Sequence, residues 1–168
     1  MRIPTPPAVI DIEASGFGAV SYPIEVGAVL RDGTKYCALI QPQPEWTHWD
    51  EGAEKVHRIS RDILEAHGKP IDEVAAKLNE LLRAQTAYSD GWVVDKTWLD
   101  RLFHAARIRC EFSLSALEMI LTEPQMEIWH DTKDRVLADL GQRRHRASFD
   151  ALVVQQTYER TRVATQQP

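Results

Sequence analysis

Short apolar runs, separated by turn residues, open the chain. Residues 8–12 are apolar and β-branched around a single acid, which is typical of a buried central strand. After a turn at 15–18, residues 23–30 and 36–41 repeat the strand pattern on either side of a Gly-containing loop. This part of the chain therefore predicts three antiparallel strands joined as a meander.

Helical periodicity dominates the rest of the chain. Val74, Leu78 and Leu82 recur at helical spacing and form an apolar face that would pack on a sheet. The predicted elements are helices over 60–67, 71–83, 95–107 and 146–161 and a strand over 86–89. This order predicts an α/β fold with a mixed sheet, which begins antiparallel, continues with parallel strands and carries helices on both faces.

The segment 42–59 is rich in Pro, Trp and charge and is expected to be irregular and to overhang a site. Its tryptophans Trp46 and Trp49, like Trp129 further on, either cover apolar core or rim a cleft. His57 has no partner at a spacing typical of zinc sites and is interpreted as structural.

Composition narrows the class of protein. The 168 residues are 43% hydrophobic and 27% charged, which favours one globular domain over residues 1–168, with a polar tail at 163–168 after a core from about 7 to 162. The chain shows no signal sequence and no membrane-spanning run, so a cytoplasmic protein with reduced Cys37 and Cys110 is expected. Its net charge of -5 disfavours a long nucleic-acid footprint, and a polyanion would have to be bound locally.

Asp11 and Glu13 lie two residues apart on the first strand, so both carboxylates point to one face near its end. Two adjacent buried acids repel each other and are costly to desolvate unless a cation compensates them. Mg²⁺ prefers carboxylate oxygens and bridges them to substrate phosphates. The alternative is a strand whose end simply emerges into solvent.

Three more polar residues fall near predicted helix starts. His145 could accept a proton near neutral pH, as a general base does, or could be an ordinary surface residue. Asp150 could join the acids of the strand or be a solvated helix carboxylate. Asp95 on its own is typical of an N-cap.

Taken together and in order, these segments resemble the DEDDh 3′-to-5′ exonucleases of the DnaQ-like, RNase H-fold superfamily, which include RNase T, oligoribonuclease and polymerase proofreading domains. The resemblance covers about residues 7–160. The matching segments are VIDIEASGF at 9–17, YPIEVGAV at 22–29, KVHRIS at 55–60, YSDGWVVDKTWL at 88–99 and HRASFDA at 145–151.

The resemblance implies which residues would form the active site. Asp11, Glu13, Asp95 and Asp150 would bind two Mg²⁺ ions, which Mn²⁺ could replace, and His145 would be the catalytic base. The residues after the first acidic pair would hold the terminal sugar and base, namely Ala14, Ser15, Gly16 and Phe17, with Phe17 in the core as the alternative.

The sequence departs from the family pattern in two places. Arg58 stands where the family usually has Gly, and Ser89 and Asp90 stand where an Asn is usual, so Asp90 is either a spare acid or itself a ligand. Trp92 is predicted to stack on substrate or to pack in the core. Arg146, in the only compact basic cluster, is predicted to contact a phosphate or to belong to an ordinary solvated patch.

The predicted function is therefore metal-dependent hydrolysis of single-stranded RNA or DNA from its 3′ end, which releases nucleoside 5′-monophosphates. A catalytically silent nucleic-acid-binding module of the same fold is one alternative, and a proofreading exonuclease associated with a polymerase is another. Several members of the family are dimers, so a homodimer is an open alternative to a monomer.

Overall fold

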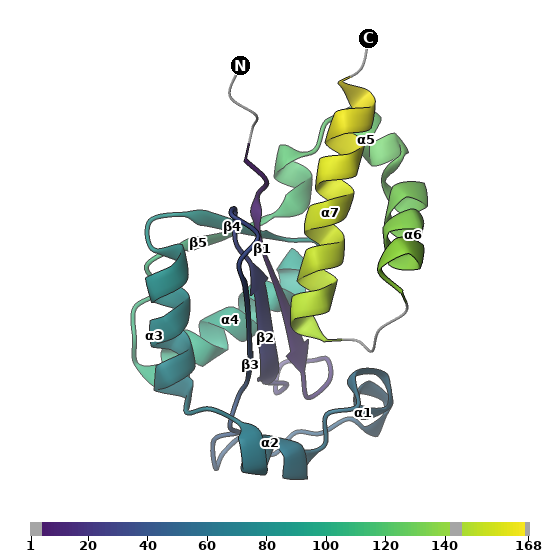
Figure 1. Ribbon diagram of the computed structural model, residues 1–168. Coiled ribbons are helices and arrows are strands. Elements are labelled where there is room, and N and C mark those ends of the chain that lie inside the picture. The colour runs from purple at the N-terminus through teal and green to yellow at the C-terminus, as the bar shows by residue number, and fades with distance from the viewer. Residues whose placement is uncertain (1–4, 142–145, 167–168) are drawn as a thin grey trace.

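A five-stranded mixed sheet forms the centre of the protein, as Figure 1 shows for a computed structural model that describes residues 5–141 and 146–166. The strands are β1 Ala8–Ala14, β2 Pro23–Val29, β3 Lys35–Leu39, β4 Thr86–Ser89 and β5 Ser113–Ala116, and their order across the sheet is β3-β2-β1-β4-β5. The first three strands pair antiparallel, whereas β4 and β5 join parallel. The predicted mixed sheet is confirmed.

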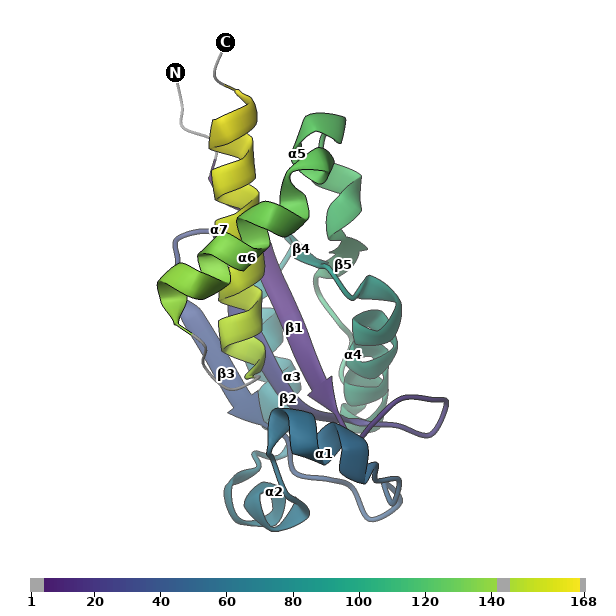
Figure 2. The same ribbon diagram turned by 90° about the vertical axis from the view of Figure 1, so that its right-hand side faces the viewer.

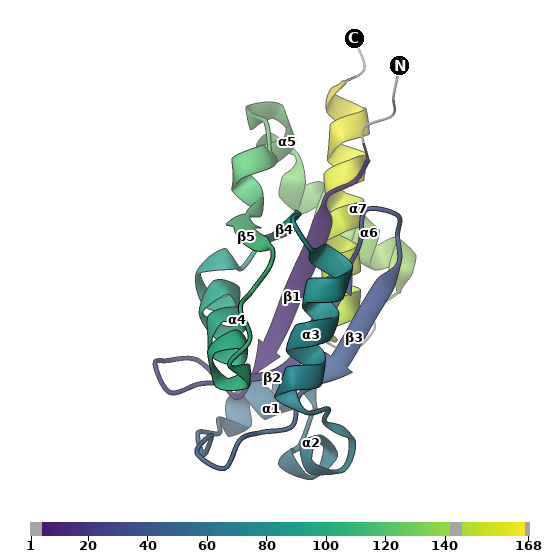
Figure 3. The ribbon, with the colours of Figure 1, turned by 90° about the vertical axis from the view of Figure 1, so that its left-hand side faces the viewer.

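Helices cover both faces of the sheet, as predicted. They are α1 Glu51–His57, α2 Arg61–His67, α3 Ile71–Leu82, α4 Trp92–Ala106, α5 Glu123–Glu127, α6 Trp129–Leu140 and α7 Ala147–Thr165, with a 3-10 turn at Leu117–Ile120. α7, flanked by α6, lies on one face (Figure 2), and α3 and α4 lie on the other (Figure 3). α1 and α2 lie beyond the end of β1.

The alternation of side chains along β1 decides which residues face which layer. Ile10 and Ile12 are buried in the cluster that contains α3 and α4, whereas Val9 packs with Ala151 and Val154 of α7. Residues 11 and 13 share the face of Val9 because the side-chain period of a strand is 2. The face of β1 that α7 covers therefore changes from apolar to acidic toward the end of the strand.

The structure corrects the prediction for 42–59, which contains α1. The carboxylate of Asp50 caps this helix by accepting hydrogen bonds from the N–H groups of Gly52 and Ala53, and the helix ends at Arg58 with φ 57. Seven residues bounded by Pro- and Trp-rich chain are too few to show a clear period. The third strand also ends earlier than predicted, at Leu39.

The region between α4 and α7 holds elements that the sequence did not predict, namely β5, α5 and α6. β5 is short and half polar, so its pairing with β4 determines its conformation more than its own pattern does. α4 begins at Trp92, three residues earlier than predicted, with Gly91 as its N-cap residue. Asp95 therefore lies in the first turn of the helix and is not its cap.

Within residues 5–141 and 146–166, no helix is both long and apolar enough to cross a bilayer. Cys37 and Cys110 are both free thiols, as predicted.

Candidate active site

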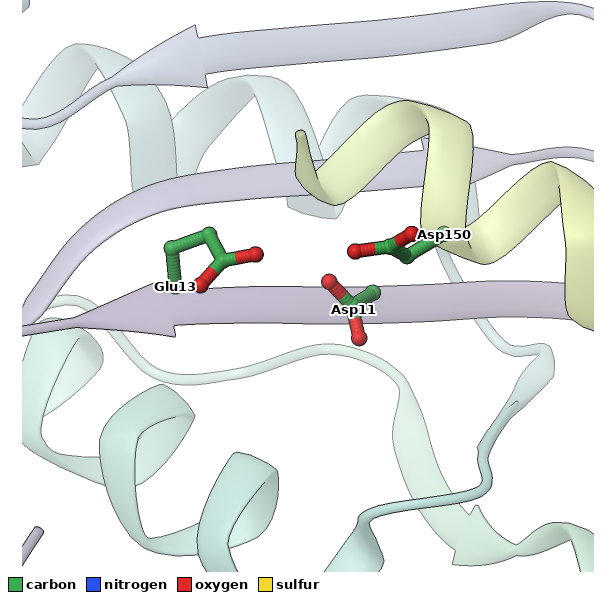
Figure 4. Close-up of side chains that lie close together, drawn as sticks. All are labelled: Asp11, Glu13 and Asp150. Carbon is green, nitrogen blue, oxygen red and sulfur yellow. The ribbon is translucent and has the colours of Figure 1, made fainter. Parts of the chain in front are cut away.

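Three carboxylates that are distant in the sequence converge between β1 and α7. Asp11 and Glu13 come from β1 and Asp150 from the first turn of α7, and each offers an oxygen within 4.8 Å of the others. Figure 4 shows the three side chains gathered in the space between the strand and the helix. The structure thus brings together three of the four acids that the sequence singled out.

The close approach of α7 to the sheet depends on Gly27 of β2. A Cβ atom at this position would lie 2.0 Å from the backbone nitrogen of Ser148, so the first turn of α7 rests directly on the strand backbone. Asp150 is the fourth residue of this helix. Asp150 therefore lies at the acidic end of β1 because the backbone of α7 packs directly on that of β2.

Burial makes this cluster electrostatically costly without a cation. Desolvation, followed by the charges of Asp95, Asp150, Glu13 and Asp90, holds the pKa of Asp11 well above its usual range. Burial first, and Asp150 next, raises the pKa of Glu13 to about 7. Each charged form is destabilised, so protons or a bound cation must compensate the cluster. Carboxylate oxygens in this number suit a hard divalent ion such as Mg²⁺ or Mn²⁺.

Asp95 lies beside this group, on the first turn of α4. Only 3% of it is exposed, and burial raises its pKa to about 7 although Ser89 Oγ donates a 2.5 Å hydrogen bond to its Oδ2 atom. It lines the same pocket as Asp11 and Glu13. Among the described residues, the carboxylates whose oxygens lie within 4.8 Å of one another are those of Asp11, Glu13 and Asp150, and Asp95 does not belong to this group.

A pocket of about 250 Å³ opens next to the acids. Its other walls are mainly apolar and come from the turn after β1, from α1 and from α4, through Ala14, Gly16, Phe17, Ala53, Val56, Val94 and Trp98. The pocket therefore combines a charged end with an apolar cradle, the combination expected of a site for a small group with one polar end.

The residues that were predicted to bind substrate, 14–17, form the end of β1 and the turn that follows it. Ala14, Gly16 and Phe17 line the pocket. Ser15 does not line the pocket; it is buried, and its hydroxyl accepts a hydrogen bond from the backbone N–H of Tyr22. Phe17 is 73% exposed, with its ring 6.0 Å from that of Trp98. It is thus not part of the core, and its ring is available at the rim of the pocket.

Val56 and His57 also line the pocket, although no pattern in the sequence had indicated either of them as a site residue. His57 Nδ1 accepts a hydrogen bond from the Ile59 N–H, so in the neutral ring the proton is on Nε2. Burial lowers the pKa of His57, which favours this neutral form. The signal that could have found both residues is the segment at 55–60 that resembles the family connector.

The remaining candidates have other partners. Asp90 forms an ion pair with Lys133 of α6 at 2.8 Å. The Trp92 indole donates to the Leu114 carbonyl oxygen, and the Arg146 guanidinium pairs with Glu25. His145 lies outside the described residues.

The structure also shows the contacts of the three tryptophans that were expected either to cover apolar core or to rim a cleft. Trp46 stacks on Tyr22 at 5.2 Å between ring centroids, and Trp49 donates to Glu54 of α1. Trp129 packs with the apolar cluster under α7 and lines a second pocket beside Asp90.

Comparison with known proteins finds similarity in structure. No protein-family model matches the chain, and no curated protein matches its sequence. Exonuclease I of E. coli in complex with a dA16 oligonucleotide superposes with a TM-score of 0.69 at 14% identity, over 98% of this chain and 42% of that one. Exonuclease I of Methylocaldum szegediense gives 0.69 at 12% identity, over 98% and 41%. The zinc-bound E. coli exonuclease I–ssDNA complex gives 0.64 at 15% identity, over 99% and 42%.

This chain spans about two fifths of the length of those structures. The fold that the resemblance implied is confirmed, because the match with exonuclease I covers 98% of this chain. The chain has the α/β fold of exonuclease I and carries an acidic cluster on it.

Proposed function

We propose that this protein is a 3′-to-5′ exonuclease that hydrolyses single-stranded nucleic acid and releases nucleoside 5′-monophosphates. The observation that carries the proposal is the convergence of Asp11, Glu13 and Asp150 within 4.8 Å on this fold, with pKa values of the strand acids raised. A cluster of this kind is stable at neutral pH when divalent cations bind it.

We assign the metal ligands to Asp11, Glu13, Asp95 and Asp150. When bound, a pair of Mg²⁺ or Mn²⁺ ions would activate a water molecule and stabilise the negative charge on the departing 3′ oxygen. The four carboxylates would hold the ions, and Ser89 would keep Asp95 oriented through its hydrogen bond. His145 would take the proton from the attacking water.

The pocket beside the acids is proposed to hold the terminal nucleotide. Its apolar walls would receive the base, and the ring of Phe17 at the rim would stack on or wedge against it. Gly16 packs closely on Asp50, since a Cβ there would lie 2.7 Å from the Cβ of Asp50, and its backbone would approach the sugar. The contact between Arg146 and a phosphate stays part of this proposal.

Single-stranded DNA is the substrate that we favour, because two of the similar structures are complexes with a dA16 oligonucleotide and with ssDNA. The use of RNA, a homodimer, association with a polymerase, a cytoplasmic location and one domain over 1–168 stay predictions from the sequence.

The test is digestion of a 5′-labelled single-stranded oligonucleotide with Mg²⁺ or Mn²⁺. We expect the wild-type protein to shorten it one nucleotide at a time, and Asp11→Asn to leave it intact. Asp139→Asn, which changes an exposed acid of α6 paired with Arg160, is the matched control and should cleave like the wild type. Equal ladders from the wild type and Asp11→Asn would refute the proposal.

A parallel binding measurement separates the enzyme from a silent binding module. The enzyme should bind the oligonucleotide more tightly with Mn²⁺ than in EDTA, because cations relieve repulsion between the carboxylates and the phosphates. Equal affinity in both buffers, without cleavage, would favour the module.

A further inference from the structure

Glu25 is a carboxylate to which the proposed chemistry gives no role, yet its side chain is fully buried. It lies on β2, opposite Glu13 of β1 in the sheet register. A buried carboxylate is strongly destabilising unless it is paired and hydrogen-bonded, so its partners indicate its role.

Both oxygens of Glu25 bind the start of α7. Oε2 accepts a 2.9 Å hydrogen bond from the backbone N–H of Ala147, the first residue of the helix. Oε1 accepts from Nε and Nη2 of Arg146 at 2.7 and 2.5 Å. The N–H groups of a first helical turn have no partner within the helix, and Arg146, the N-cap residue, makes no side-chain cap. Glu25 therefore supplies this cap from a strand.

Arg146 connects this cap to the acidic cluster. Its guanidinium is held by Glu25, and its carbonyl oxygen accepts the backbone N–H of Asp150 at 3.0 Å. The carboxylate of Asp150 lies within 4.8 Å of those of Asp11 and Glu13. One continuous set of hydrogen bonds thus runs from β2 through the start of α7 to the backbone of the third acid.

We propose that Glu25 is a positioning residue, which holds the start of α7 through Ala147 and Arg146 so that Asp150 stays beside Asp11 and Glu13. Because its oxygens are already engaged, Glu25 does not act as a further metal ligand. The part of the proposal that concerns metal binding rests on the proposed function, whereas the part that concerns the helix does not.

Hydrogen exchange in EDTA tests the hold on the helix. Glu25→Gln keeps the size of the side chain but replaces one acceptor with a donor. We expect the amides at the start of α7 to exchange about tenfold faster in this variant, as follows from the loss of a hydrogen bond to a charged group. Asp139→Asn, which breaks the pair between Arg160 of α7 and α6, should leave these amides unchanged. Unchanged exchange in Glu25→Gln would overturn the proposal.

Titration with Mn²⁺ by calorimetry tests the consequence for the site. Loss of a group that orients a metal ligand weakens metal binding 10- to 100-fold, so we expect at least a tenfold weaker Mn²⁺ affinity in Glu25→Gln. The kcat should recover in part with excess Mn²⁺. A merely structural role would lower the melting temperature and leave the Mn²⁺ affinity unchanged, and that result would overturn the proposal.

Two further outcomes are distinguishable. If the wild type neither binds Mn²⁺ nor cleaves, the proposed function fails, and the exchange rates at α7 still decide whether Glu25 holds the helix. If Glu25→Gln does not fold, Arg146→Gln is the second variant, because it removes the same ion pair at the partner whose side chain is half-exposed. It should also speed amide exchange at the start of α7 and weaken Mn²⁺ binding. Wild-type values for both in that variant would refute the positioning role.

Discussion

Ser89 Oγ donates a 2.5 Å hydrogen bond to Asp95 Oδ2, joining the last residue of β4 to the first turn of α4. Both residues are buried. Desolvation raises the pKa of Asp95, and this hydrogen bond opposes that rise by stabilising the ionised carboxylate. Ser89 thus favours the ionised form of this buried acid.

Ser89→Ala should therefore weaken Mn²⁺ binding. Without the hydrogen bond the pKa of Asp95 rises further, so the cation must displace a proton more often, and the acid limb of the pH–activity profile should move to higher pH. We expect about a tenfold higher Mn²⁺ requirement at pH 7. Thr157→Ala, which removes a buried hydroxyl bonded to the Val153 carbonyl, should lower stability without moving the profile. An unmoved profile in Ser89→Ala would contradict this role.

The acidic cluster should make the metal-free protein less stable as the pH rises. Glu13 has its pKa raised from 4.5 to about 7 in the folded protein, so between these values the unfolded chain binds fewer protons and the free energy of unfolding falls. Glu13→Gln should match the wild type near pH 4.5 in EDTA and exceed its stability at pH 8 by on the order of 2 kcal/mol.

Thermal melts at both pH values check this prediction. Mn²⁺ should raise the melting temperature of the wild type at pH 8 and have a smaller effect on Glu13→Gln. A variant less stable than the wild type at pH 8 in EDTA would show that Glu13 is not under electrostatic strain.

Gly27→Ala should displace the start of α7. The new Cβ would meet backbone atoms of Ala147 and Ser148, which cannot move like a flexible side chain, so we expect a loss of about 3 kcal/mol together with loss of Mn²⁺ binding. Gly33→Ala adds a Cβ in open space at a residue with φ +83. It should cost about 1 kcal/mol and leave Mn²⁺ binding intact. Calorimetry and denaturant unfolding of both variants separate the two effects, and wild-type Mn²⁺ binding by Gly27→Ala would contradict the prediction.

Arg58→Gly should stabilise the protein. Arg58 ends α1 in the left-handed region with φ 57, where a side chain is unfavourable. The relief of about 1–2 kcal/mol is partly offset by the greater freedom of Gly in the unfolded chain, which leaves a gain of up to about 1 kcal/mol. Arg58→Ala keeps the unfavourable backbone and should give no such gain. Equal unfolding midpoints for the two variants would indicate that the conformation carries no cost.

Phe17→Ala should raise the KM for a single-stranded oligonucleotide about tenfold, as expected when one base loses a stacking partner. The Mn²⁺ affinity should not change, because Phe17 lies at the rim of the pocket, away from the carboxylates of the cluster. Val163→Ala, at another exposed apolar residue, is the control and should behave like the wild type. An unchanged KM in Phe17→Ala would remove this residue from the substrate site.

Much of the fold could be predicted because local patterns and tertiary packing agree there. The apolar runs of β1 and β2 and the apolar face of α3 at Val74, Leu78 and Leu82 each require buried neighbours, and the packing of helices on the sheet provides them. The segment 113–140 could not be predicted in this way. Its short strand and helices depend on the edge of β4 and on α7, which the local sequence does not reveal.

The residue pattern of the first strand is enough to place Asp11 and Glu13 on one face, because side chains alternate along a strand with a period of 2. What surrounds these two acids follows from the folded arrangement of the chain. Asp150 reaches the strand because Gly27 has no side chain to hold α7 away, and the Arg146 guanidinium pairs with Glu25. Strand periodicity is a local property of the backbone, whereas the approach of a helix more than a hundred residues away depends on close packing and on the pairing of buried charges.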